Sequence, residues 1–77
     1  MVISQADVVT GVISSVESFG SIVIVWIALN PPARGHRAIY FELRPFYHML
    51  ADRGGQLIGE PVHYHEDDEP WFAFEAV

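Results

Sequence analysis

Residues 7–25 read DVVTGVISSVESFGSIVIV, and the way this segment folds governs the rest of the chain. The pair Phe19-Gly20 divides it into two apolar arms. In one interpretation Val8 to Glu17 is a strand, Ser18-Phe19-Gly20 turns the chain, and Ile22 to Leu29 pairs back against the first arm. β-Branched residues dominate both arms and suit a pleated surface. Gly11 then lies within a strand, where glycine usually marks a bulge or sharp coiling.

A second interpretation makes Gln5 to Phe19 a helix. Six apolar residues then form one stripe at i, i+3 and i+4 spacing: Val8, Val9, Val12, Ile13, Val16 and Phe19. Ser4 would be the N-cap and Gly20 the C-cap. This helix predicts an α+β fold of the helix-hairpin-helix-hairpin kind with one antiparallel sheet. Its composition opposes it, because glycine, threonine and valine are poor helix formers.

Four segments resemble a known family. They are Gly11 to Val23 with its Phe19-Gly20 pair, Ile39-Tyr40-Phe41-Glu42-Leu43, Gly59-Glu60-Pro61-Val62-His63-Tyr64, and Ala73 to Val77. In this order they resemble the cold-shock domain and the ribosomal S-one type RNA-binding repeat. Both families are OB-fold barrels. The resemblance favours a mainly β fold, a small five-stranded OB-like barrel over residues 1–77, against the helix-first alternative.

The remaining elements follow from breakers and apolar spacing. Asn30 to Arg37 holds two prolines and a glycine and predicts a loop. We expect strands at Ala38 to Leu43, Leu57 to His65 and Trp71 to Ala76. Between strands three and four we expect one short helix, Pro45 to Arg53, that ends at Gly54-Gly55. Strand alternation predicts that Ile58, Val62 and Tyr64 face inward, with His63 and His65 on the other side.

Length and composition restrict the class of protein. Seventy-seven residues with 51% hydrophobic content indicate one small globular domain. The absence of cysteine excludes disulfides and thiolate chemistry. We expect no signal peptide, and Ser21 to Leu29 is too short to cross a bilayer. The default expectation is a cytoplasmic protein with no membrane association.

The family resemblance implies weak single-stranded nucleic-acid binding, to RNA or DNA. By position, Phe19 and Tyr40 would stack on bases, and Arg34 and Arg37 would contact phosphate. Two features oppose this role. The net charge is −6, and Glu17 and Glu42 replace a lysine and a histidine of the family pattern. We therefore expect any such binding to be weak and strongly dependent on salt.

The alternative is a non-enzymatic protein-interaction module that forms homo-oligomers and binds no nucleic acid. Ser21 to Leu29 is apolar on both faces, and a chain this small cannot bury both. Exposed apolar patches mark interaction sites. On this hypothesis Ile24 and Trp26, which share one strand face, belong to the oligomer interface.

Other chemistry has little support in the sequence. His63 and His65, followed by Glu66, Asp67 and Asp68, are residue types that bind zinc, but two firm ligands are missing. Serines, histidines and Asp52 occur without the spacing of a catalytic motif. We therefore expect no metal, no cofactor, no catalytic residue and no enzymatic activity.

Overall fold

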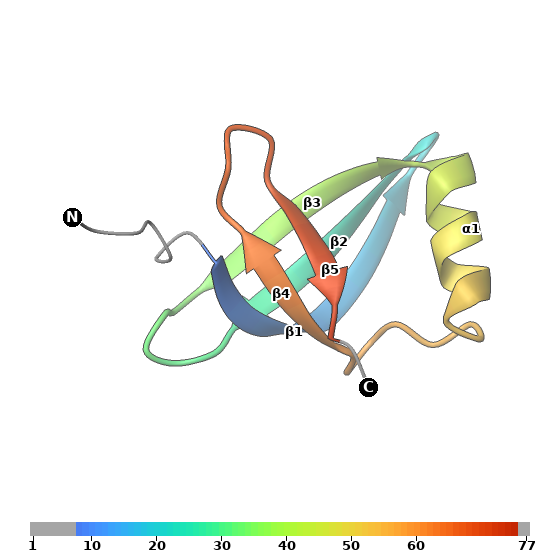
Figure 1. The fold of residues 1–77 in the computed structure, drawn as a ribbon. Helices are drawn as coiled ribbons and strands as arrows, with labels where there is room; N and C mark the ends of the chain where they lie inside the picture. Colours follow the sequence, from blue (N-terminus) through green and yellow to red (C-terminus); the bar gives the residue numbers. More distant parts are fainter. Residues whose placement is uncertain (1–7, 76–77) are drawn as a thin grey trace.

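A computed structural model describes residues 8–75 of the chain (Figure 1). It contains five strands and one helix, which are β1 (Val8–Phe19), β2 (Ile22–Leu29), β3 (His36–Glu42), α1 (Leu43–Asp52), β4 (Pro61–His65) and β5 (Trp71–Phe74). All the pairings are antiparallel and form one sheet of order β3-β2-β1-β4-β5. The mainly β prediction with a single helix between strands three and four is confirmed. The helix-first alternative is wrong, since residues 8–19 form a strand.

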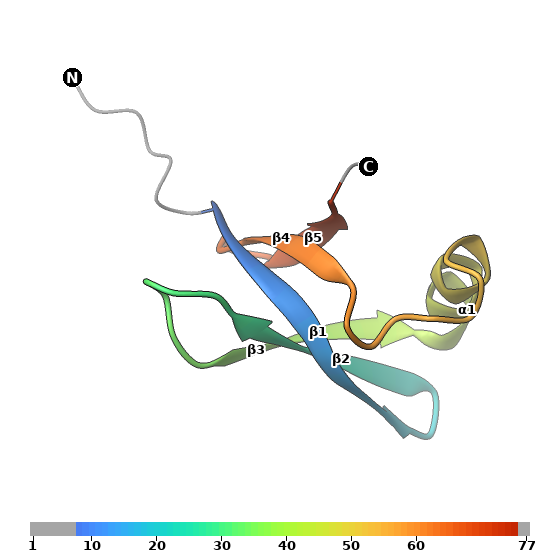
Figure 2. The same ribbon diagram turned by 90° about the horizontal axis from the view of Figure 1, so that it is seen from below.

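Strand β1 is the centre of the sheet and is shared by two partners. Its first part, 8–12, pairs with β4, and residues 11–19 pair with β2. Figure 2 shows the consequence, with β2 and β3 on one side of a twisted β1 and β4 and β5 on the other. Gly11 lies where the pairings overlap, opposite both Leu29 and Val62. A Cβ atom there would lie 2.7 Å from Ile27 Cγ2 and 2.8 Å from the Ala28 carbonyl oxygen. Glycine is therefore required at this position by close packing, and the bulge of the strand lies elsewhere, between Ile13 and Ser15.

A β-bulge at Ser14 explains one step of the helix-like spacing in this segment, the step from Ile13 to Val16. Ile13 pairs with Ile27, but the next pair is Ser15 with Trp26, so β1 contains one extra residue. The Ser14 hydroxyl donates a hydrogen bond to the Trp26 carbonyl oxygen at 3.2 Å. The extra residue reverses the alternation of the strand. Ile13 and Val16, three residues apart, consequently pack on the same core.

The core lies on the inner face of this sheet and beneath α1. It contains Ile13, Val23, Val25, Ile27, Ile39, Phe46, Leu57, Val62 and Tyr64. The alternation expected for strand two is confirmed, because its three core residues alternate with more exposed ones. The expected inward position of Ile58 is wrong, because that side chain is 63% exposed and Leu57 is buried instead. Residues 57–60 form a turn with Gly59 at φ +94°, so β4 begins only at Pro61.

Other element boundaries shift by one to two residues. The first strand continues to Phe19, and β3 begins at His36 and ends at Glu42. Leu43 belongs to α1, which starts two residues before the expected Pro45 and ends at Asp52. The expected last strand ends at Phe74, and residues 76–77 lie outside the described part of the chain.

The described sheet is open, because β3 and β5 are its two edges and no backbone pairing joins them. Side chains nevertheless connect the two halves. The Phe41 and Phe72 rings meet edge to face with centroids 5.8 Å apart. Arg53, after α1, donates a hydrogen bond to Glu60 at 2.6 Å and lies over the Phe74 ring. Packing of these aromatic and paired charged groups shields the core between the edges.

Candidate binding face

The sheet has a second face on β1, β2 and β3, which we name the outer face. In antiparallel strands directly paired residues share a face, so the register assigns its members. Four rows run across the three strands: Phe19–Ile22–Glu42, Glu17–Ile24–Tyr40, Ser15–Trp26–Ala38 and Val12–Ala28–His36. Helix α1 packs on the core, on the other side of the sheet.

Large apolar side chains on the outer face are exposed to solvent. Tyr40 is 67% exposed, Phe19 61% and Ile22 38%. Ile24, in the row of Tyr40, and Trp26, in the next row, are half-buried. The Trp26 indole is held in place because its Nε1 donates a hydrogen bond to Glu17 Oε1 at 3.0 Å. Contiguous apolar surface of this kind marks contact sites in soluble proteins.

The structure brings four of the predicted site residues together. Phe19 and Tyr40, expected to stack on bases, lie on the same face as Ile24 and Trp26, expected at an oligomer interface. Ile22 belongs to the same surface, and the sequence interpretation missed it. Strand alternation contained the signal, since Ile22 stands two residues before Ile24.

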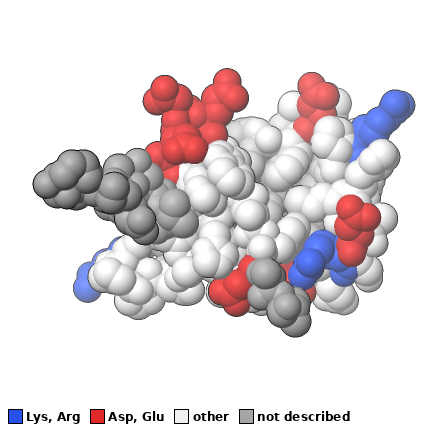
Figure 3. All heavy atoms as spheres, viewed as in Figure 1, with Lys and Arg blue, Asp and Glu red and all other residues white. Residues whose placement is uncertain are grey.

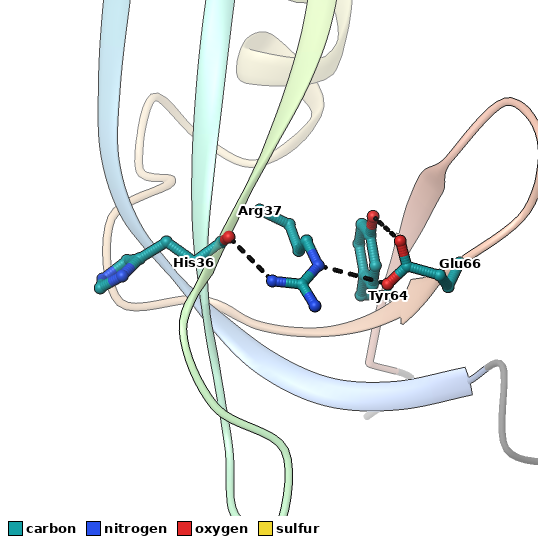
Figure 4. A network of polar contacts seen from close by, with 4 residues as sticks. All are labelled: His36, Arg37, Tyr64 and Glu66. Carbon is teal, nitrogen blue, oxygen red and sulfur yellow. Dashed lines mark hydrogen bonds and ion pairs between the residues drawn. The ribbon is translucent and has the colours of Figure 1, made fainter.

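Arg37 does not join this surface. It pairs with the buried Ile27 and so lies on the inner side of β3. Figure 4 shows its side chain between β3 and β4. Its Nε forms an ion pair with Glu66 Oε1 at 3.2 Å, and its Nη1 donates a hydrogen bond to the His36 carbonyl oxygen. The Tyr64 hydroxyl donates to Glu66 Oε2 at 3.3 Å. Burial, and secondly the Glu66 carboxylate, raises the pKa of Tyr64.

Arg34 is exposed, but it lies in the β2–β3 loop at the far end of the sheet from Phe19. Six residues of strand separate the two ends, or about 20 Å. The carboxylates Glu17 and Glu42 are closer neighbours of Tyr40, in its own row and the adjacent one. The predicted phosphate contacts and stacking residues are therefore not assembled into one basic surface.

The distribution of charge over the molecule also argues against a basic nucleic-acid surface. Figure 3 shows acidic side chains gathered over the β4–β5 hairpin, which contains Glu66, Asp67, Asp68 and Glu69, whereas the basic side chains in this view lie apart from one another. Two of the four arginines form ion pairs with glutamates. A nucleic-acid surface normally has clustered cationic side chains.

The two strand histidines have partners of their own. His63 lies 3.6 Å from Glu75, measured between Nε2 and Oε2, and His65 stacks on Trp71 with ring centroids 3.7 Å apart. Within residues 8–75 no group of three metal-ligating side chains is placed to hold an ion. The described helix is not long and apolar enough to cross a membrane.

An apolar hollow of about 270 Å³ lies between α1 and the turn before β4. Its lining includes Phe46, Leu50, Leu57 and the exposed Ile58. The sequence interpretation did not expect it, because it placed Ile58 in the core.

Comparison with protein-family models, with curated proteins and with solved structures finds no match to this chain.

Proposed function

We propose that this protein is a non-enzymatic binding module of OB-like architecture whose outer face contacts another protein. The observation that carries the proposal is the apolar surface of Phe19, Ile22, Ile24, Trp26 and Tyr40 on one side of the sheet. Aromatic residues of this kind form the centres of protein interfaces, where charged residues are sparse.

The OB-like part of the proposal rests on topology. In that fold the first strand pairs with both the second and the fourth, and a helix connects strands three and four. Strand β1 here pairs with β2 and β4, and α1 follows β3. Contact between the Phe41 and Phe72 rings supports a barrel-like curvature, because they come from the two edge strands.

Electrostatics favour a protein partner over a nucleic acid. A strand of phosphates crossing Phe19 and Tyr40 would meet Glu17 and Glu42, and Arg37 is engaged with Glu66 on the other side of β3. Cationic contacts supply most of the affinity in nucleic-acid binding. An apolar protein surface requires no such contacts.

Single-stranded nucleic acid remains the second candidate because Phe19 and Tyr40 are exposed on the same face. Stacking contributes roughly 1–3 kcal/mol per base. Two aromatic residues without assembled arginines therefore support dissociation constants of about 10 micromolar or weaker at physiological salt. A fluorescence titration with mixed single-stranded DNA and RNA at low and moderate salt tests this candidate.

Site-specific photo-crosslinking in cells tests the protein-contact proposal. A photoreactive phenylalanine replaces Tyr40 in one experiment and Tyr47 in a matched control. Both tyrosines are exposed, at 67% and 57%, but Tyr47 lies on α1 and outside the outer face. The proposal predicts nuclease-resistant protein adducts from position 40 that position 47 does not form. Equal adducts at both positions, or adducts at position 40 that nuclease removes, would refute it.

A further inference from the structure

The two ends of the outer face differ in charge, because carboxylates lie at one end and the loop that contains Arg34 follows the other. Exposed Glu17 and Glu42 lie in the two rows nearest the β1–β2 turn. Exposed His36 is the β3 member of the last row. Exposed Arg34 lies two residues before it, in the β2–β3 loop. Arg44, in the first turn of α1, forms no ion pair with either carboxylate in the described structure. The apolar rows between the ends carry no cation.

This arrangement distinguishes the ways in which two copies could pack face to face. A two-fold axis between such faces lies in the interface plane. If the axis runs along the strands, the acidic ends of both copies meet, and Glu17 and Glu42 of each copy repel those of the other. If the axis runs across the strands, the acidic end of each copy meets the basic end of the other.

We propose that the outer face binds a second copy of this chain about an axis across the strands, near the Trp26 row. This inference rests on the proposed function, since it names the protein partner of the same face. Strand β3 of one copy then lies over β3 of the other in the opposite direction. Glu42 of each copy faces the loop that contains Arg34 of the other, and Tyr40 faces His36. The half-buried Ile24 and Trp26 become fully covered.

The size of the face sets the strength of the contact. Three strands and four rows span about 14 Å by 25 Å, or roughly 350 Å² in projection. Stable complexes bury about 800 Å² of accessible surface on each partner. The dimer is consequently weak, and its population depends on concentration.

Sedimentation velocity on the full chain, from low micromolar to near-millimolar concentration, tests the contact. Glu42→Arg and Arg34→Glu each replace an attraction across the interface with a repulsion. Each change should therefore weaken dimerisation by roughly fivefold or more at low salt. The doubly substituted chain restores the opposite charges and should dimerise as the original does. If Glu42→Arg alone strengthened dimerisation, the acidic ends of the two copies would lie together, and the proposed axis would be wrong.

A matched pair of apolar substitutions tests which surface is used. Ile24→Glu introduces a charge into the middle of the outer face and should leave a monomer. Ile58→Glu introduces the same charge at a site that is 63% exposed and outside this face, and it should leave the dimer unchanged. Far-UV circular dichroism and a thermal melt verify that both variants fold. Loss of the dimer in the Ile58 variant but not the Ile24 variant would refute the inference.

The crosslinking experiment separates failure of this inference from failure of the proposed function. A monomer at near-millimolar concentration, with Tyr40-directed adducts to a different protein, overturns only the second copy as partner. A monomer without adducts specific to position 40 overturns both. Adducts of twice the chain mass support both.

Discussion

Replacing Gly11 by alanine tests the packing at the centre of the sheet. Gly11 lies where β1 is paired with both Leu29 and Val62. Its backbone is outside the left-handed region, so alanine can adopt the same conformation. The added methyl group, however, would lie 2.7 Å from Ile27 Cγ2 and 2.8 Å from the Ala28 carbonyl oxygen. The whole cost of Gly11→Ala therefore comes from collision.

The size of this cost follows from what the methyl group meets. Overpacking a well-packed site typically costs about 1–3 kcal/mol. One of the two obstacles is a backbone oxygen of β2, which cannot move without disturbing the sheet, and Ile27 is fully buried. We therefore expect Gly11→Ala to lower the free energy of unfolding by about 2–4 kcal/mol. This is at or above the upper end of the usual overpacking cost. For a chain of this length that is a fall in melting temperature of roughly 12–25 °C.

Urea denaturation followed by tryptophan fluorescence measures the change, and Gly20→Ala provides the control. Gly20, in the β1–β2 turn, has φ +60° and no atom within 4 Å of an added Cβ. Its substitution carries only the backbone penalty of the left-handed region, about 1–2 kcal/mol. Gly11→Ala should be the more damaging change. A loss at Gly11 no larger than the loss at Gly20 would show that β1 is not shared as described.

The remaining predictions concern charge and pH. Because the pKa of Tyr64 is raised in the folded protein, folding favours its protonated form. The contribution of Tyr64 to stability is complete below the unfolded pKa of about 10, and it declines as pH rises through the higher pKa of the folded protein. Urea midpoints measured across this pH range should therefore fall in the unchanged protein and fall less in Tyr64→Phe. Arg53→Met should lower the free energy of unfolding by about 1 kcal/mol in urea denaturation. It removes a partly exposed ion pair with Glu60 and a cation–π contact with Phe74. An unchanged midpoint would show that the ion pair is not stabilising. If oligonucleotides bind at all, Glu42→Lys should tighten binding most at low salt, because salt screens the new attraction, and a fluorescence titration that shows no such dependence would exclude the outer face as their site.

Local sequence patterns were sufficient to predict most helices and strands and part of the candidate site. Alternation within residues 22–29 correctly separated the buried Val23, Val25 and Ile27 from Ile24 and Trp26. This works because the period of a strand is a property of its own backbone. The same alternation places Phe19 and Tyr40 on the exposed face once the strands are paired in register. Glycine pairs and prolines likewise predicted the position of the helix, because they restrict the backbone directly.

Features that depend on contacts between distant segments required the tertiary structure. The bulge at Ser14 lies in the pairing with β2, and it puts Ile13 and Val16 on one face at a spacing that a helix would also give. Leu57 is buried and Ile58 exposed because Gly59 turns the chain and hydrogen-bonds to Ile13 of β1. Arg37 faces Glu66, twenty-nine residues along the chain, a partner that no local spacing can indicate. Periodicity therefore determined which residues alternate, whereas register and long-range pairing decided which side of the sheet each charge occupies.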